Sequence, residues 1–260
     1  MPEGHTIHRL ALDLARDFAG RQVASSSPQG RFAEADELNG RVFASAQAIG
    51  KHLFVDIGGK RVHVHLGLFG KFRRPRGDRA PSASVRWRLQ AEGRTWDLTG
   101  PTACHLVGEA EMEAYRERLG ADPLAPGPRP ASLWQKVHKS KRPIGALLLD
   151  QSLFAGIGNV YRAELLFLVG LSPETPGALV PKPTFERMWK LAKELLQKGV
   201  AANRIVTVPG PAKRRRDRLY VYKRWECMRC QSRIRRSTLA ARTMYHCPTC
   251  QTEPAQAAAS

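Results

Sequence analysis

The sequence lacks long hydrophobic runs, and this absence limits the kinds of protein it can encode. Its longest stretches without a charged residue, such as residues 151–161 and 165–173, are far shorter than the ~18 to 20 apolar residues of a membrane-spanning helix. The first residues contain no basic segment followed by an apolar run. We therefore expect no secretory signal, no membrane insertion and a cytoplasmic location.

Negative charge is scarce. The 260 residues contain 23 Asp and Glu against 42 Lys and Arg, a formal net charge of +19. Residues 1–118 have 18 basic and 14 acidic residues, residues 119–226 have 19 and 8, and residues 227–260 have 5 and 1, for net charges of +4, +11 and +4. This excess predicts a polyanionic partner, with nucleic acid first and an acidic membrane surface second.

Cysteine is also scarce, and four of the five cysteines lie within 24 residues near the C-terminus. They form two Cys-x2-Cys pairs separated by sixteen residues: Cys227, Cys230, Cys247 and Cys250. Each pair can present two thiolates from one turn, and four protein ligands leave no open coordination position. We expect one structural zinc ion holding a hairpin that has too little core to fold alone. The remaining cysteine, Cys104, is expected to be packed inside.

Apolar residues in the first half of the chain recur with two different periods. Residues 6–18 repeat apolar side chains at helical spacing. Residues 52–66 alternate around a Gly58-Gly59 turn, and residues 85–98 alternate around Glu92-Gly93, which predicts two hairpins. We expect a β-sandwich with flanking helices over residues 1–118.

A proline-rich segment separates the halves, with four prolines and two glycines in residues 119–130. Helical spacing returns at residues 132–139, 144–149, 160–169 and 184–198, where Thr184 is a candidate cap. The predicted fold is α+β and multidomain. Its parts are an N-terminal β-sandwich domain at 1–118, which is the candidate catalytic domain, a linker at 119–131, a helical domain at 132–226, which is the candidate DNA-binding domain, a zinc finger at 227–253 and a disordered tail at 254–260.

Pro2 and Glu3 are candidates for catalysis. Removal of Met1 would expose a secondary amine at the start of an ordered helix, and such an amine can attack an electrophilic carbon and form an iminium ion. Glu3 lies within reach for proton transfer. Proline and an acid are also ordinary residues at a helix start, so these two residues alone leave both readings open.

Two glycine-bounded segments are candidates for binding. Gly156-Ile-Gly158-Asn159 precedes an apolar helix, where backbone N–H groups suit an anion, although a tight turn needs the same glycines. Leu68 and Phe69 lie between glycines at the end of the first hairpin. They can either wedge into a base stack or pack between domains.

The zinc hairpin contains five arginines and no acid before residue 253, which suggests contacts with phosphate. The arginines are Arg229, Arg233, Arg235, Arg236 and Arg242. A solvated basic face is the alternative for any one of them. Arg242 differs because it lies five residues before Cys247, where the tip of the hairpin is expected.

The order of these motifs resembles the formamidopyrimidine-DNA glycosylase and endonuclease VIII family of bacterial base-excision repair enzymes, over nearly the whole chain. The matching motifs are Pro-Glu-Gly at 2–4, Gly50-Lys51-His52-Leu53, His65-Leu-Gly67, Leu148-Leu-Asp150-Gln, Gly156-Ile-Gly-Asn-Val-Tyr161, Glu164-Leu-Leu-Phe167, and the cysteine module at 227–251. The resemblance implies a helix-two-turns-helix motif in the helical domain and a C-terminal zinc finger with four cysteine ligands.

The resemblance also implies residue roles. Pro2 is the expected nucleophile that forms a Schiff base, Glu3 the acid, and Lys51 a catalytic contact to phosphate. Asn159 and Arg242 are expected to bind phosphates beside a flipped nucleotide, with Gly156 and Gly158 in the same DNA-binding turn, and Leu68 and Phe69 to intercalate. The implied reaction is cleavage of the glycosylic bond followed by β,δ-elimination. No catalytic metal or nucleotide cofactor is implied.

Departures from the family pattern bear on the substrate. Much of the family has Pro-Glu where this chain has His5-Thr6, so the chain lacks one acidic residue there. His5 is either a substitute for that acid or a packed residue. Residues 144–145, 97–105 and 213–222 lack features of the purine-directed branch. The chain is therefore expected to resemble the endonuclease VIII branch and to excise oxidised pyrimidines. Damaged duplex DNA is the expected partner, with single-stranded or bubble DNA left open, and the protein is expected to be a nucleoid-associated monomer.

Two other functions compete with this hypothesis. A non-catalytic DNA-binding protein would keep the phosphate-binding residues and the finger without the chemistry. A zinc-ribbon protein that binds RNA or acts in translation would explain the charge and the cysteines, but not Pro2, Glu3 and Lys51.

Overall fold

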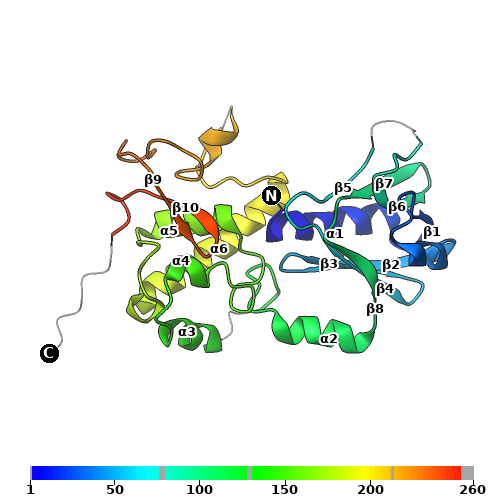
Figure 1. Cartoon of the computed structure of the whole chain (residues 1–260), viewed down its shortest axis with the longest axis horizontal. Coiled ribbons are helices and arrows are strands. Elements are labelled where there is room, and N and C mark those ends of the chain that lie inside the picture. The colour runs from blue at the N-terminus through cyan, green and yellow to red at the C-terminus, as the bar shows by residue number, and fades with distance from the viewer. Residues whose placement is uncertain (1, 76–79, 128–130, 212–213, 253–260) are drawn as a thin grey trace. The chain divides into compact units, whose positions relative to one another are not determined.

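A computed structural model of the chain describes residues 2–75, 80–127, 131–211 and 214–252 (Figure 1). The chain divides into two compact units, residues 1–118 and 119–260. The expected tail at 254–260 and residues 128–130 of the expected linker lie outside the described residues. In the part of the chain that is described, no helix is long and apolar enough to span a membrane.

In the first unit, one helix precedes the strands in the sequence and another follows them. Its elements are α1 (Gly4–Phe18), β1 (Gln22–Ser26), η1 (Ala33–Leu38), β2 (Arg41–Ile49), β3 (His52–Ile57), β4 (Lys60–His65), β5 (Lys71–Arg73), β6 (Val85–Ala91), β7 (Arg94–Thr99), β8 (Ala103–Val107) and α2 (Glu109–Arg118). Hydrogen bonds join the strands in the order β5-β7-β6-β1-β2-β3-β4-β8. Neighbouring strands are antiparallel throughout.

These eight strands form two halves around one core. Strand β1 pairs with β2 through only two residues and continues along β6, so it links β2-β3-β4-β8 to β6-β7-β5. Side chains from both halves meet in one buried cluster that includes Phe43 and Val55 from one half and Trp87 and Leu98 from the other. The predicted α+β fold class with its N-terminal sheet domain is confirmed, and the shared strand β1 explains how the sandwich closes.

Helix α1 covers this core. Ile7, Leu14 and Phe18 are completely buried, at the helical spacing that the sequence shows. The two predicted hairpins are also present, as β3–β4 around Gly58-Gly59 and β6–β7 around Glu92-Gly93. Helix α2 is the second of the expected flanking helices, but no sequence pattern gave its position, because it is rich in charge and buries a single apolar side chain, that of Met112.

The second unit is helical and ends in a small hairpin. Its elements are α3 (Ala131–His138), α4 (Ile144–Leu147), α5 (Asn159–Val169), η2 (Gly177–Leu179), α6 (Lys182–Ala202), η3 (Arg215–Arg218), β9 (Arg235–Leu239) and β10 (Arg242–His246). All four predicted helices are present. Helix α5 is buried almost from end to end, and α6 packs against it.

Two local expectations in this unit need adjustment. Thr184 does not cap α6, because the helix begins earlier: Pro181 is at the cap and Pro183 lies in the first turn, where no N–H donor is needed. The first part of the expected linker is held in place, since the Ala121 N–H donates to the Leu153 carbonyl and the Ala155 N–H donates to the Ala121 carbonyl.

The cysteine hairpin shares the core of the helical unit. Ile234, Met244 and Cys247 are buried in the same cluster as α5 and α6. The chain after the last cysteine is also fixed, because the Gln251 side chain donates to the Leu171 carbonyl at 3.0 Å. The hairpin therefore obtains from its helical neighbour the core that its own sequence is too short to supply.

Candidate active site and nucleic-acid interface

The N-terminal residues are held at the entrance to α1. Glu3 is completely buried and occupies the cap position in extended conformation, with φ −128° and ψ 178°. Its carbonyl accepts the Thr6 N–H at 2.8 Å, while its side chain makes no capping hydrogen bond. The carboxyl group is thus buried at the start of α1 without capping the helix. Pro2, which precedes it, is half-buried.

His5 lies in the first turn of α1 and is 5% exposed. Burial lowers the pKa of His5 to about 4. Its Nε2 atom lies 3.3 Å from the Thr6 hydroxyl. At neutral pH the imidazole is therefore neutral, which favours a packed and hydrogen-bonded role over that of a charged substitute for the missing acid.

Lys51 lies in the turn that joins β2 to β3 and is half-buried. Its positive charge contributes to lowering the pKa of His65, after the larger effect of burial. The ammonium group is therefore close to the start of β3 and the end of β4. This position follows from the Gly50-Lys51 turn, because Gly50 has φ +58°.

The segment with Leu68 and Phe69 is a tight glycine-bounded turn. Gly70 N–H donates to the Leu66 carbonyl at 2.9 Å, and a Cβ atom on Gly67 would lie 2.4 Å from Thr102 Cγ2. Both glycines are therefore required by the close approach of their neighbours. The turn leaves Leu68 42% and Phe69 83% exposed. Two apolar side chains projecting from a fixed turn suit insertion between bases.

Sequence reasoning missed a layer of histidines on β3, β4 and β8. His52 Nδ1 lies 2.9 Å from His63 Nε2, and His63 Nδ1 lies 3.2 Å from the Tyr115 hydroxyl on α2. His63 also packs against His105, and His52 against His65, with ring centroids 5.2 and 4.8 Å apart. Burial lowers the pKa values of His52 and His63 to about 3. The two rings are neutral at pH 7 and pack as part of the fold.

In the second unit, a half-buried glutamine shapes the turn before α5. The Gln151 side-chain amide donates to the carbonyls of Leu149 and Ile157 at 2.9 and 3.0 Å, and its oxygen accepts the Gly156 N–H at 3.1 Å. Gly156 has φ +94°, and Gly158 is the cap of α5. The turn therefore presents the start of α5 in a fixed geometry, as an anion site requires.

Asn159, the first residue of α5, is joined to the β9–β10 hairpin. Its Nδ2 atom donates to the Thr243 carbonyl at 2.9 Å, beside Arg242 on β10. Its Oδ1 atom accepts a hydrogen bond from Arg162. Arg242 itself is exposed and directly follows the β9–β10 turn, opposite Leu239. The structure thus brings Asn159 and the tip of the hairpin together, as the two expected phosphate contacts require.

Arg162 is the centre of this junction, and sequence reasoning gave it no role. The side chain is completely buried, and its Nη1 atom donates to the carbonyls of Gly145 and Leu239 at 3.3 and 3.1 Å. Its Nη2 atom reaches the Thr243 carbonyl at 3.4 Å as well as Asn159. One guanidinium therefore joins the α4 region, α5 and the hairpin tip.

Glu164, further along α5, fixes the chain that leads to the zinc module. Its carboxylate accepts the backbone N–H groups of Tyr220, Val221 and Tyr222 at 2.7, 2.9 and 2.9 Å, and the Thr207 hydroxyl. Burial raises the pKa of Glu164, while the four donors favour its charged form. Its environment is that of a structural anchor.

The four cysteines form one cluster whose sulfur atoms all lie within 4.8 Å of one another. The Cys230–Cys247 and Cys230–Cys250 sulfur distances are both 3.4 Å, and Cys227–Cys250 is 3.9 Å. Tetrahedral zinc with Zn–S bonds of about 2.3 Å places its sulfurs about 3.8 Å apart. Backbone N–H groups also approach the sulfurs of Cys227 and Cys247 at 3.4 Å, which stabilises thiolates. The donor set fits a single metal ion.

The chain matches two family models, which cover most of it. The model described as the formamidopyrimidine-DNA glycosylase N-terminal domain matches residues 1–103, and the model described as the formamidopyrimidine-DNA glycosylase H2TH domain matches residues 119–208.

Among curated proteins, "Endonuclease 8 1" of Mycobacterium tuberculosis is 44% identical, covering 97% of this chain and 100% of that protein. "Formamidopyrimidine-DNA glycosylase" of Thermus thermophilus is 31% identical, covering 97% and 98%. Among solved structures, the Lactococcus lactis Fpg protein in complex with abasic-site DNA has a TM-score of 0.80 at 23% identity, covering 96% of this chain and 100% of that chain. The chain therefore has the same fold as that solved structure. The chain belongs to the formamidopyrimidine-DNA glycosylase and endonuclease 8 family of DNA glycosylases/AP lyases, which act in base excision repair.

Proposed function

We propose that this chain excises oxidised pyrimidines from damaged DNA and then cleaves the strand, using the amine of Pro2 as nucleophile. The observation that supports this most is the placement of Glu3: a completely buried carboxyl, next to Pro2, that takes no part in capping α1. A nucleophilic amine with an adjacent acid is the minimum that Schiff-base chemistry on a sugar requires.

The reaction begins after Met1 has been removed. The Pro2 nitrogen forms a bond to the anomeric carbon as the bond to the damaged base breaks, and the base leaves with its electron pair and a proton. Glu3 donates a proton to the ring oxygen, so that the sugar opens and the nitrogen becomes an iminium ion. Loss of a proton from the adjacent carbon expels the 3′ phosphate, and a second elimination expels the 5′ phosphate. The strand is left gapped with a phosphate at both ends.

Other residues bind the DNA around this centre. Lys51 contacts a phosphate beside the lesion, and Asn159 and Arg242 contact phosphates flanking the extruded nucleotide. Leu68 and Phe69 fill the space that the nucleotide leaves, which offsets the few kcal/mol needed to extrude a base. The metal ion is zinc, and the residues that hold it are Cys227, Cys230, Cys247 and Cys250. When bound, zinc supplies a structural crosslink that keeps the hairpin and Arg242 in position.

The preference for pyrimidines is supported by residues 144–145, 97–105 and 213–222, which lack features of the purine-directed branch. The 44% identity to a protein named "Endonuclease 8 1" agrees with this assignment.

Borohydride trapping tests the proposal. The full-length protein, confirmed by mass to lack Met1, is incubated with duplex DNA containing thymine glycol or an abasic site, and borohydride reduces any iminium to a stable adduct. We expect an adduct with both substrates. A matched protein with a short uncleavable N-terminal extension, which removes the secondary amine, should form none, whereas Leu179→Ala should be trapped like wild type. DNA binding without any adduct would instead support the non-catalytic alternative.

A further inference from the structure

Trp225 lies at the entrance to the zinc module, and its side chain is 68% exposed. Its backbone is nevertheless fixed. The Ile234 N–H donates to the Trp225 carbonyl at 2.8 Å, and the next residue, Glu226, forms an isolated antiparallel bridge with Arg233. A large aromatic ring is therefore presented to solvent from a rigid support, which is what a stacking platform requires.

One arginine, Arg236, lies over this ring, and Arg233 and Arg235 line the same pocket. The guanidinium carbon of Arg236 lies 4.1 Å from the centre of the Trp225 ring and 5.6 Å from that of Tyr245. Arg233 and Arg235 are exposed. Among the residues that the structure describes, none of these three arginines forms an ion pair with an acid. Their positive charge is available to an external anion.

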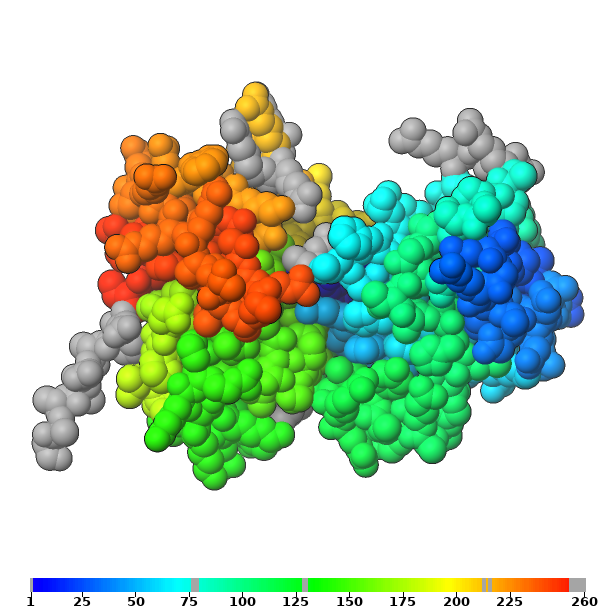
Figure 2. Space-filling model, viewed as in Figure 1, coloured from blue at the N-terminus to red at the C-terminus, as the bar shows by residue number. Residues whose placement is uncertain are grey.

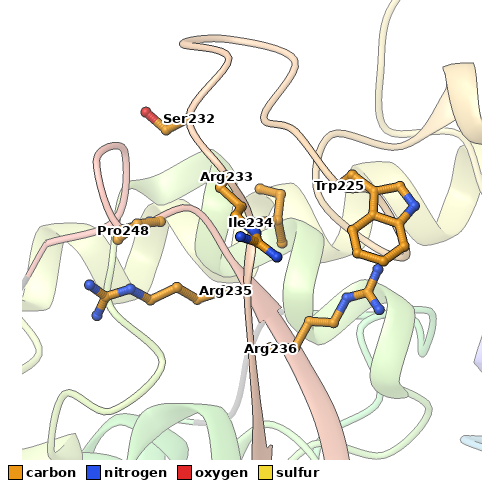
Figure 3. A pocket seen from close by; sticks show the side chains of 7 residues that line it. All are labelled: Trp225, Ser232, Arg233, Ile234, Arg235, Arg236 and Pro248. Carbon is orange, nitrogen blue, oxygen red and sulfur yellow. The ribbon is translucent and has the colours of Figure 1, made fainter.

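These side chains line a pocket of about 470 Å³, which we call the Trp225 pocket (Figure 3). Its lining residues are Trp225, Ser232, Arg233, Ile234, Arg235, Arg236 and Pro248. In Figure 3 the Arg236 guanidinium lies against the indole ring, while Arg235 extends toward Pro248. The module, orange to red in Figure 2, forms part of the surface of its unit in that view. The pocket thus combines an aromatic wall, an apolar wall and positive charge that no acid of the described chain neutralises.

We propose that the Trp225 pocket binds unpaired nucleic acid, with a base stacked in the pocket and its phosphates against Arg233 and Arg235. Stacking on an aromatic face together with backbone charge contacts is the usual mode for single strands. This proposal rests on the proposed function, because it gives the DNA-binding unit a second contact surface. It differs from that function in needing neither a lesion nor Pro2.

The position of the pocket on the hairpin favours a polymer over a short acidic peptide. Arg242 lies at the tip of the β9–β10 hairpin, and Arg235 lies opposite His246 at its other end. The strand from Arg242 to His246 rises about 13 Å at the usual spacing of residues in a strand. A nucleic-acid strand of a few nucleotides can contact both ends, and its repeating phosphates match the arginines at each.

The test measures binding of the full-length, zinc-loaded protein to a labelled oligothymidine of about 12 nucleotides by fluorescence anisotropy. Trp225→Ala should weaken binding about fivefold or more, and Trp225→Phe, which keeps an aromatic face, should weaken it less. The double variant Arg233→Ala/Arg235→Ala should also reduce the salt dependence of binding, by a slope of about one. Leu179→Ala and Arg204→Ala remove an exposed apolar side chain and an exposed charge elsewhere in the unit, and should bind like wild type.

Unchanged oligothymidine affinity in Trp225→Ala, with zinc content intact, would overturn the proposal. The proposal would also fail if Trp225→Ala still bound oligothymidine but no longer bound an oligo-aspartate peptide containing one phenylalanine. The pocket would then recognise a protein and not a nucleic acid. A parallel assay follows cleavage of a blunt duplex with a central lesion, in which Trp225→Ala should match wild type. If wild type cleaves the duplex but oligothymidine binding does not depend on Trp225, the pocket proposal fails and the proposed function stands. Trp225-dependent binding without any cleavage supports it and defeats the proposed function.

Discussion

Glu3 combines two features that rarely occur together in a carboxyl group: complete burial and a helix-cap position that it does not use for capping. Placing a carboxyl there has a desolvation cost that an ordinary helix start would avoid. The role in proton transfer that we propose for Glu3 would account for that placement.

Replacing Glu3 by Gln keeps the shape of the side chain and removes its acidity. We expect the excision rate on thymine glycol duplex to fall about 100-fold or more, because general acid–base catalysis typically contributes that much. Affinity for the same duplex, measured by gel shift under conditions without turnover, should stay within about threefold. Equal excision rates for Glu3→Gln and wild type would remove Glu3 from the chemistry.

Arg162 shows how a buried charge can act through other residues. Replacing it by Met leaves the carbonyls of Gly145, Leu239 and Thr243 without its donors. The free energy of unfolding should fall by about 2 to 4 kcal/mol, since each buried polar group left unsatisfied costs about 1 to 3 kcal/mol. Urea denaturation provides the measurement. Arg187→Met, which removes one hydrogen bond from an exposed arginine, is the control and should change stability by less than about 0.5 kcal/mol.

At the scale of elements, periodic patterns predicted helices and hairpins well. Helix α1 and the hairpins β3–β4 and β6–β7 follow from apolar spacing and glycine turns, which are local signals. The histidine layer could not be found this way. The alternation of His63 and His65 along β4 places them on one face, and Tyr115 of α2 packs against this layer, but the charge-rich sequence of α2 gives little indication of a packed helix.

The histidine layer predicts a pH-dependent stability. His63 has a folded-state pKa of about 3, lowered mainly by burial and also by electrostatic interactions with His52, His105, His65 and Arg118. The unfolded chain therefore binds a proton near pH 6.5 that the folded chain does not. Each such histidine makes its full contribution to the free energy of unfolding above that pH. The contribution is lost as the pH falls toward 3, by about 2 kcal/mol between pH 6.5 and 5.

His63→Phe removes one titrating ring and keeps an aromatic side chain beside Phe54 and Tyr115. The decrease in unfolding free energy between pH 7.5 and pH 5 should be smaller in the variant than in wild type. Denaturation at the two pH values gives the comparison, and the half-buried His8→Phe is a suitable reference. An identical pH dependence in His63→Phe and wild type would show that His63 does not stay neutral in the folded state.

Removal of the metal ion should change the DNA affinity that depends on the β9–β10 hairpin. Removing the metal with a chelator should detach the β9–β10 hairpin from Asn159 and reduce affinity for lesion-containing duplex about tenfold or more, because Arg242 and its support are lost together. Metal analysis should give one zinc per chain before treatment, and added zinc should restore binding. Full affinity in metal-free protein would mean that Arg162 and the shared core hold the hairpin without the metal.

At the scale of the molecule, charge and chemistry lie in different parts of the chain. Residues 1–118 have a net charge of +4, whereas residues 119–226 have +11 and residues 227–260 have +4. The net charge predicted a polyanionic partner but not which residues bind it. The family motifs nominate Asn159 and Arg242, and the structure adds Arg162 as their buried support, whose burial a single sequence does not reveal because arginine is ordinarily exposed.

If the covalent intermediate forms on Pro2, the trapped adduct must be attached to the first residue of the processed chain. The borohydride-reduced adduct with abasic-site DNA is digested with nuclease and protease, and the modified peptide is sequenced by mass spectrometry. Our account predicts the sugar remnant on the peptide that begins with Pro2-Glu3-Gly4, with the mass increment on the proline nitrogen. A remnant found instead on Lys51 or another lysine, with Pro2 unmodified, would contradict it.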